Sequence, residues 1–494
     1  MVTTNLYREM PVQTLAAPQI SSALDARSPS VKDVVMSASS PGNVVPMKQI
    51  AMYGGAAWVA PLAGAFLVAA LFRPVTALEI PVVEYELSNG LQLLVHEDHQ
   101  APVVASYIFY RSGSGNEQIG HTGIAHLFEH MMFNGSQKYG AGTFDDLIEG
   151  AGGSTNGFTT RDFTVYLNDF PPEALDIVLG LEADRMANLL LTARNLEQER
   201  GIVKEERRLR IDNDVLATMN EQLYLLGLVA SPYRWDTVGF MADLDAITLE
   251  SARAYFARYY APNNATLVLA GDVESNEAHR AVVRAFGRIP AAEPPPAVLN
   301  VEPRQLGARR AIVYKEAELP ALLIGYRAVA AAASERPALD VLDVLLSGGE
   351  SSRLHRRLVY ESELATTAWT SFGWLRHPGM FLVYAQARPD SDIEAVEDGV
   401  LAVLKTAREE EPGERELRKA KNIMLSSHVR GMKTVGGKAR QLGYYNALFG
   451  DYRALFRVEA EWEAVTAEDV VRVAKTYLTP RNSTTIVLVP ESSE

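Results

Sequence analysis

The stretch "ITLESARAYFARYYAPNNATLVLAG", residues 247–271, decides the fold because the chain repeats it 218 residues later as "VTAEDVVRVAKTYLTPRNSTTIVLVP", residues 465–490. The two copies align without a gap, and the matched pairs include Thr248 with Thr466, Tyr259 with Tyr477, and Pro262 with Pro480. In each copy the threonine can cap a helix that ends at a proline turn, and the apolar run after the turn predicts a buried strand. The repeat therefore predicts an internal duplication.

The same offset gives the domain boundaries. It carries Leu78 onto Pro296, inside the proline-rich stretch "PAAEPPPAVLNVEP", which is typical of a linker. We expect one domain at residues 78–292, a linker at 293–303, and a homologous domain at 304–494. Strand patterns open each half and long helical patterns follow, so the predicted class is α+β. Each domain is expected to be an α/β roll, with a mixed, largely antiparallel sheet and helices on one face.

The N-terminal 77 residues do not read as part of either domain. Residues 1–46 lack sustained periodicity and suggest disorder or an over-extended start. Residues 47–77 have one early lysine, a long apolar run and the small-residue ending Val75-Thr76-Ala77, which is typical of a secretory signal peptide. The alternative is a retained membrane anchor. Both interpretations place the rest of the chain outside the cytoplasm, and the periplasm is the expected compartment.

Composition excludes several classes of function. The formal net charge is -14, which argues against a nucleic-acid surface, since phosphate binding rests on clustered lysine and arginine. The chain has no cysteine, so disulfides, thiolate ligands and a cysteine nucleophile are excluded. Any metal must be held by histidine or carboxylate side chains.

One segment has the composition of such a site. In "AHLFEHMMF", residues 125–133, His126 and His130 are four apart and share one stripe of a predicted helix, with Glu129 beside them. Neutral imidazoles at this spacing bind zinc well, and a non-ligating glutamate next to them can deprotonate an activated water. The order His-x-x-Glu-His is that of inverted zinc peptidases. The alternative is a pair of surface histidines.

A third ligand is expected, because catalytic zinc usually has three protein ligands and one open position. The best candidate segment is "NLEQERGIVKEERRLRIDND", residues 195–214, which is helical by pattern and rich in carboxylates. Glu199 and Glu206 are two turns apart on one face, so one can ligate while the other supports it. Spacing alone does not choose between Glu205 and Glu206, and a solvated charged helix remains the alternative.

These motifs together resemble the pitrilysin and insulin-degrading-enzyme family, and most closely its short two-domain bacterial members related to mitochondrial processing peptidase. The resemblance covers essentially all of residues 78–494, including "HLFEH", "ERGIVKEE" and "GGSTNGFTTRDFTVYL". It implies a zinc-dependent endopeptidase with one zinc per chain that hydrolyses unfolded peptides. By the same resemblance His126, His130 and Glu206 bind the zinc, Glu129 is the general base, and Glu199 supports the site.

The resemblance also implies how substrate and partner bind. The segment that contains Asn156, Gly157 and Phe158 would take a peptide as an added strand, although an ordinary core strand is the alternative. Longer relatives supply an arginine and a tyrosine from a second pair of domains, and Val359 and Thr366 stand at those positions here. We therefore expect a heterodimer with a homologous chain that carries both residues, with a homodimer as the alternative. A rival function is a non-catalytic peptide-binding or assembly subunit.

Overall fold

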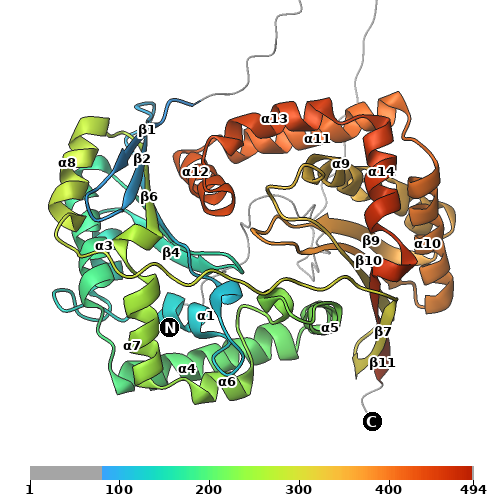
Figure 1. The fold of residues 1–494 in the computed structure, drawn as a ribbon, viewed down its shortest axis with the longest axis horizontal. Coiled ribbons are helices and arrows are strands. Elements are labelled where there is room, and N and C mark those ends of the chain that lie inside the picture. Colours follow the sequence, from blue (N-terminus) through green and yellow to red (C-terminus); the bar gives the residue numbers. More distant parts are fainter. Residues whose placement is uncertain (1–79, 492–494) are drawn as a thin grey trace, which may run out of the picture. The chain divides into compact units, whose positions relative to one another are not determined.

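The computed structural model describes residues 80–491, and these belong to one compact unit. The predicted signal peptide and the segment before it lie outside the described residues. Two sheets organise the described chain (Figure 1). The first has the order β1-β2-β6-β3-β5-β4 and the second the order β7-β11-β8-β10-β9.

The strands of the first sheet are β1 (Val83–Glu86), β2 (Gln92–Glu97), β3 (Val104–Tyr110), β4 (Ser154–Thr159), β5 (Thr164–Phe170) and β6 (Ala265–Gly271). Those of the second are β7 (Arg309–Glu316), β8 (Ala321–Arg327), β9 (Ala365–Phe372), β10 (Met380–Ala387) and β11 (Ser483–Glu491). Each sheet has one parallel pair, β2 with β6 and β7 with β11, and its other pairs are antiparallel. The mixed, largely antiparallel class is confirmed.

The helices of the first half are α1 (Ile124–Met131), α2 (Thr143–Gly150), α3 (Leu175–Asn188), α4 (Ala193–Arg207), α5 (Val215–Gly227), α6 (Met241–Ala246), α7 (Leu249–Tyr259) and α8 (Ser275–Phe286). Those of the second half are α9 (Arg336–Ser347), α10 (Ile393–Glu409), α11 (Glu414–Gly431), α12 (Val435–Phe449), α13 (Ala454–Ala464) and α14 (Ala467–Tyr477). A π-helical turn, Arg208–Asp212, continues α4.

The repeated stretch forms the same structure twice. Helices α7 and α14 begin after Thr248 and Thr466, whose side chains accept hydrogen bonds from the backbone amides of Ser251 and Asp469. Each helix leads through a short 3₁₀ turn that begins at a proline into a strand, β6 or β11. The cap satisfies amides that would otherwise lack a partner, so the local sequence explains where both helices start. The predicted duplication is confirmed.

Each sheet is covered on both faces, because each half contributes one helix that packs against the sheet of the other half. Helix α12 of the second half packs against β3 and β6, and α5 of the first half packs against β8 and β11 (Figure 1). All seven residues of β3 are buried, and alternate ones belong to different apolar clusters. The sequence predicts helices on one face, and the structure adds a helix from the other half on the second face.

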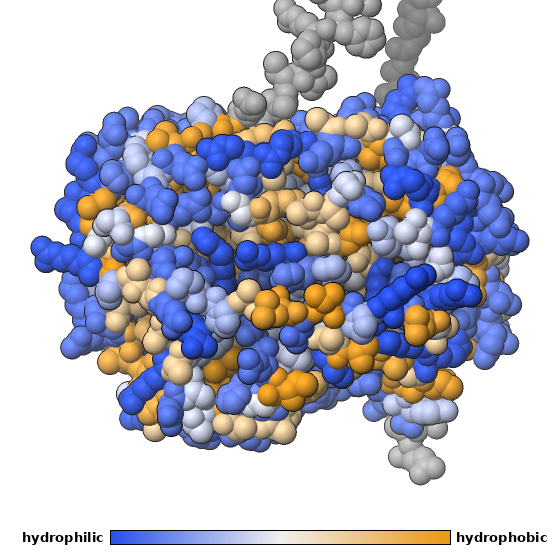
Figure 2. All heavy atoms as spheres, viewed as in Figure 1, coloured by the Kyte–Doolittle hydropathy of each residue, from blue (hydrophilic) through white to orange (hydrophobic). Residues whose placement is uncertain are grey.

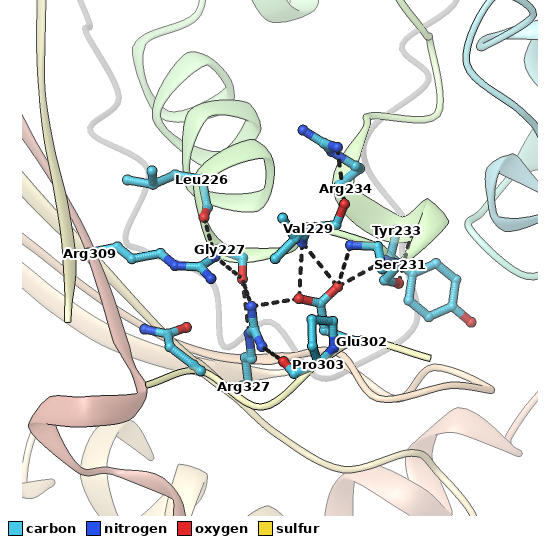
Figure 3. A network of polar contacts seen from close by, with 12 residues as sticks. Leu226, Gly227, Val229, Ser231, Tyr233, Arg234, Glu302, Pro303, Arg309 and Arg327 are labelled. Atoms are coloured by element: carbon cyan, nitrogen blue, oxygen red, sulfur yellow. Dashed lines mark hydrogen bonds and ion pairs between the residues drawn. The ribbon is translucent and has the colours of Figure 1, made fainter. Parts of the chain in front are cut away.

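Glu302, in the proline-rich segment between the halves, makes several polar contacts. Glu302 accepts hydrogen bonds from the backbone amides of Val229, Ala230 and Ser231 and pairs with Arg327 at 2.6 Å (Figure 3). Arg327 in turn donates to the Gly227 carbonyl at the end of α5. The segment therefore contributes polar contacts that tie the end of α5 to the second sheet.

The solvent-exposed surface is mainly hydrophilic on the face that Figure 2 shows. On the face drawn in Figure 2, hydrophilic residues are interspersed with smaller groups of apolar ones. Between residues 80 and 491, no helix is long and apolar enough to cross a membrane.

Candidate metal centre

Helix α1 carries the two histidines and is fixed at its N-terminus and along one side. Its N-terminal amides include those of Gly123 and Ala125, which donate to the buried carboxylate of Glu117 at 3.0 and 2.8 Å. Leu127, Phe128 and Met131 are fully buried in the apolar cluster of the first half. The remaining side of the helix presents His126, Glu129 and His130.

Helix α4 lies beside α1 and brings the carboxylates to these histidines. Oε2 of Glu206 lies 3.2 Å from Nε2 of His130 and 3.8 Å from Nε2 of His126. Glu199 contacts the other nitrogen of the same ring, with its Oε2 3.4 Å from Nδ1 of His130. Two turns of α4 separate the carboxylates, as the shared helical face requires.

The structure separates Glu206 from Glu205, which spacing alone cannot do. The Glu205 side chain is 66% exposed and pairs with Arg208 on the outer side of α4. The Glu206 side chain is 13% exposed, and its other oxygen, Oε1, pairs with Arg210 in the π-helical turn. Only Glu206 therefore has an oxygen directed at both imidazoles.

His126, His130 and Glu206 fit a zinc ion. Their ligand atoms all lie within 4.8 Å of one another, and no other group of three histidines or carboxylates in residues 80–491 meets this condition. A tetrahedral zinc site with bonds of about 2.1 Å has ligand-to-ligand edges of about 3.4 Å. The distances of 3.2 and 3.8 Å from Glu206 to the two imidazoles bracket that value.

The electrostatics show a site with excess negative charge. Burial disfavours a charged His130, but hydrogen bonds to Glu199 and Glu206 outweigh it and raise the pKa of His130 to about 9. Burial would also raise the pKa of Glu206, yet contacts with His130 and His126 lower it. Burial lowers the pKa of His126. The two carboxylates therefore favour a positive charge at this place, which a divalent cation would supply.

Glu129 lies next to the candidate ligands and is held by the sheet. Its Oε2 accepts a hydrogen bond of 2.6 Å from the hydroxyl of Thr159, the last residue of β4. Sequence reasoning did not identify Thr159. The signal was present, since Thr155, Gly157 and Thr159 alternate along a strand and so share the face turned toward α1.

The three substrate-binding candidates lie on β4, which is an edge strand of the first sheet in the described part of the chain. Asn156 is exposed, and its side-chain oxygen accepts a hydrogen bond from the Gly157 amide at 2.8 Å. Gly157 is buried on the side of Phe133, while Phe158 packs on the opposite side against Phe163. Their place on an edge strand is what strand addition needs, and their role in binding stays a prediction.

The second half has no equivalent of this centre among its described residues. Helix α9 takes the place of α1 in the duplicated topology, and its sequence "RPALDVLDVLLS" contains no histidine. Ten of its twelve residues are buried, so it serves as core. Val359 is partly buried in a π-helical turn, and the Thr366 hydroxyl bonds to Gln386, whereas the Tyr360 side chain is exposed.

Comparisons with known proteins agree with this arrangement. The family model described as "Insulinase (Peptidase family M16)" matches residues 92–225, and the model described as "Peptidase M16 inactive domain" matches residues 246–424. The first match contains the candidate metal centre, and most of the second match lies in the half without it.

Proteins named as zinc proteases are similar to this chain over most of its length. The zinc protease PqqE of Helicobacter pylori is 31% identical over 408 residues, which cover 82% of this chain and 92% of that protein. The Bacillus subtilis protein named "Uncharacterized zinc protease YmxG" is 23% identical over 404 residues, which cover 81% and 96%.

Solved structures show the same fold. The crystal structure of a protease from Helicobacter pylori has a TM-score of 0.80 and 30% identity, and the match covers 83% of this chain and 100% of that one. The structure of a peptidase M16 inactive domain from Pseudomonas fluorescens has a TM-score of 0.73 at 18% identity, covering 84% and 99%. The 31% identity to a relative over 82% of the chain, together with the two family models, shows that the chain belongs to the M16 family of peptidases, as a two-domain bacterial member.

Proposed function

We propose that the chain is a zinc-dependent endopeptidase that hydrolyses unfolded peptides. The observation that carries the proposal is the convergence of His126, His130 and Glu206 on one point, with Glu129 beside them and outside the ligand set. The names of the relatives, which are zinc proteases, support the choice of metal. One zinc ion per chain is expected.

The side chains divide the work. When bound, zinc would supply Lewis acidity at the scissile carbonyl and at the attacking water. Glu129 takes a proton from that water and returns it to the departing amine, so no covalent enzyme intermediate is needed. Glu199 keeps the ring of His130 in place through Nδ1. The products are a new carboxyl terminus and a new amino terminus.

Peptide binding is assigned to the free edge of β4. An extended peptide can form backbone hydrogen bonds with an edge strand, which gives affinity without demanding a particular sequence. The edge carries Asn156, Gly157 and Phe158, and the strand ends at Thr159 beside Glu129. A folded protein has few extended segments whose backbone groups are unpaired, so unfolded peptides are the expected substrates.

The compartment and the partner are part of the proposal. The signal-like segment at residues 47–77 supports export to the periplasm. A homologous partner is proposed because neither Val359 nor Thr366 can donate the charged or phenolic hydrogen bond that would stabilise a developing oxyanion. The exposed hydroxyl of Tyr360 is the alternative donor within this chain. Full activity of the chain alone, unchanged by a candidate partner in a mixing experiment, would contradict the heterodimer.

Hydrolysis of a quenched unfolded peptide tests the function. The protein is assayed as purified, after removal of metal by a chelator, and after addition of one equivalent of zinc. We expect cleavage that disappears with the metal and returns with zinc. A peptide that is bound but never cut, by the chain alone or with a partner, would instead favour the non-catalytic subunit.

A further inference from the structure

We propose that Thr159 is a positioning residue that couples peptide docking on β4 to the orientation of Glu129. The inference rests on the peptidase function proposed above. Thr159 donates from Oγ1 to Oε2 of Glu129 at 2.6 Å and lies at the end of the edge strand where the peptide would add. One residue thus contacts the general base through its side chain and would face the substrate with its backbone.

The register of β4 shows which backbone groups face the free edge. Strands β4 and β5 pair without a bulge, and the turn that joins them is closed by a hydrogen bond from the Thr160 amide to the Phe163 carbonyl. In an antiparallel ladder, hydrogen-bonded and non-hydrogen-bonded pairs alternate. The pair next to this turn, Thr159 with Thr164, is therefore non-hydrogen-bonded, and the Thr159 amide and carbonyl point away from β5.

The same alternation gives two further edge positions, Gly157 and Thr155. The Gly157 amide already has a temporary partner, since it donates to the side chain of Asn156 at 2.8 Å. A peptide strand would replace that side chain as the acceptor. Alternate residues of a strand have their side chains on the same face. The residues whose backbone faces the peptide are therefore also those whose side chains face α1.

The number of available protons determines that Thr159 is the donor in its hydrogen bond with Glu129. A threonine hydroxyl has one proton to donate, and an ionised carboxylate is the strongest acceptor within its reach. Thr159 Oγ1 also lies 3.2 Å from Thr164 Oγ1, and Thr164 donates to the Ser112 carbonyl at 2.8 Å. Thr159 therefore gives its proton to Glu129 and fixes one carboxylate oxygen, which leaves the other to accept the proton of water.

This geometry predicts that loss of the Thr159 hydroxyl changes kcat without changing KM or zinc affinity. Loss of the hydroxyl would leave the backbone edge of β4 and the three candidate ligands untouched, so KM for a peptide and zinc affinity should be unchanged. The base would lose its fixed orientation, and kcat should fall. Misplacement of a reacting group by about 1 Å can lower the rate by about a hundredfold, so a partial loss of orientation is expected to cost about tenfold.

Three variants of the full chain test the proposal. Thr159→Val removes the donor and keeps the shape, Thr159→Ser restores the donor, and Thr484→Val is the matched control. Thr484 lies on β11 of the second sheet, and its buried hydroxyl has no hydrogen-bond partner among the described residues. The measurements are kcat and KM for an unfolded peptide, and zinc affinity by competition with a chromogenic chelator.

We expect Thr159→Val to lower kcat about tenfold or more at unchanged KM and zinc affinity, with Thr159→Ser and Thr484→Val within about twofold of wild type. An active wild type with an equally active Thr159→Val variant would overturn the role of Thr159 alone. So would a Thr159→Ser variant as impaired as Thr159→Val, or a loss of zinc in Thr159→Val. A wild type that cleaves no peptide while binding zinc would overturn the proposed function and this role with it.

Discussion

The Oε2 atom of Glu199 lies 3.4 Å from Nδ1 of His130, on the side of the ring opposite to Glu206. His126 has no such support, because its Nδ1 is buried without a hydrogen-bond partner among the described residues. One imidazole therefore has a second carboxylate beside its Nδ1, and the other does not.

Glu199→Gln is expected to weaken zinc binding by about tenfold to a hundredfold, because a carboxylate that bonds the second nitrogen of a ligand histidine fixes its tautomer and raises its basicity. Competition with a chromogenic chelator measures the affinity. Glu197→Gln is the matched control, since its side chain is 73% exposed on the same helix and pairs with Arg200. Equal affinities of the two variants would show that Glu199 does not support His130.

Glu206→Gln should lose most of its zinc, whereas Glu205→Gln should keep it. The first change removes the carboxylate that lies 3.2 Å from His130 and 3.8 Å from His126, and the second changes a carboxylate that pairs with Arg208 on the surface. Elemental analysis of the two purified proteins gives the comparison. The opposite ranking would assign the third ligand to Glu205.

Gly443→Ala should destabilise the protein. Gly443 lies in α12 where a Cβ atom would clash with the ring of Phe109, a residue of β3 that is 1% exposed. An alanine inside a helix normally stabilises by about 0.5–1 kcal/mol, and overpacking a core costs about 1–3 kcal/mol, so the net free energy of unfolding should fall.

Denaturant unfolding measures that change. Gly413→Ala is the control, because an added Cβ atom meets nothing within 4 Å at that position before α11. If Gly443→Ala were as stable as the control, α12 would not lie this close to the first sheet.

Acid should destabilise the second half through His428. Burial lowers the pKa of His428 to about 4, from 6.5 for a free histidine, and Glu459 at 3.7 Å does not outweigh this. The unfolded chain takes up the proton near pH 6.5 and the folded chain only near pH 4. Stability present above pH 6.5 is therefore lost as the pH falls toward 4, by at most about 3 kcal/mol.

His428→Gln should show a flatter loss of stability between these pH values, because glutamine takes up no proton. Unfolding curves at several pH values, with the exposed His121→Gln variant as control, measure the slope. An unchanged slope in His428→Gln would assign the acid sensitivity to other groups.

The local parts of this fold could be predicted from sequence because local rules determine them. Threonine caps at Thr248 and Thr466, the proline turns and the apolar strands repeat at one offset, and each follows from a few adjacent residues. The histidines of α1 could be predicted as neighbours for the same reason, since four residues make slightly more than one helical turn.

The contacts that could not be predicted from the sequence are those between segments far apart in the chain. Helix α5 is apolar enough to pack on any sheet, and nothing in its own pattern says that Met219 and Leu223 meet Leu323 and Ile486 of the second half. The hydrogen bond between Thr159 and Glu129 depends likewise on how β4 lies against α1. The choice of Glu206 over Glu205 required the rotation of α4, which spacing leaves undetermined.

Glu129→Gln tests the central claim most directly, with two quantities measured on one preparation: bound zinc per chain and turnover of an unfolded peptide. The amide preserves the shape and can still accept the hydroxyl of Thr159, but it cannot take a proton from water, a step worth about two to four orders of magnitude. We predict one zinc per chain and turnover reduced at least about a hundredfold relative to wild type. Turnover above about a tenth of the wild-type value, with zinc still bound, would contradict Glu129 as the general base and with it this account of the site.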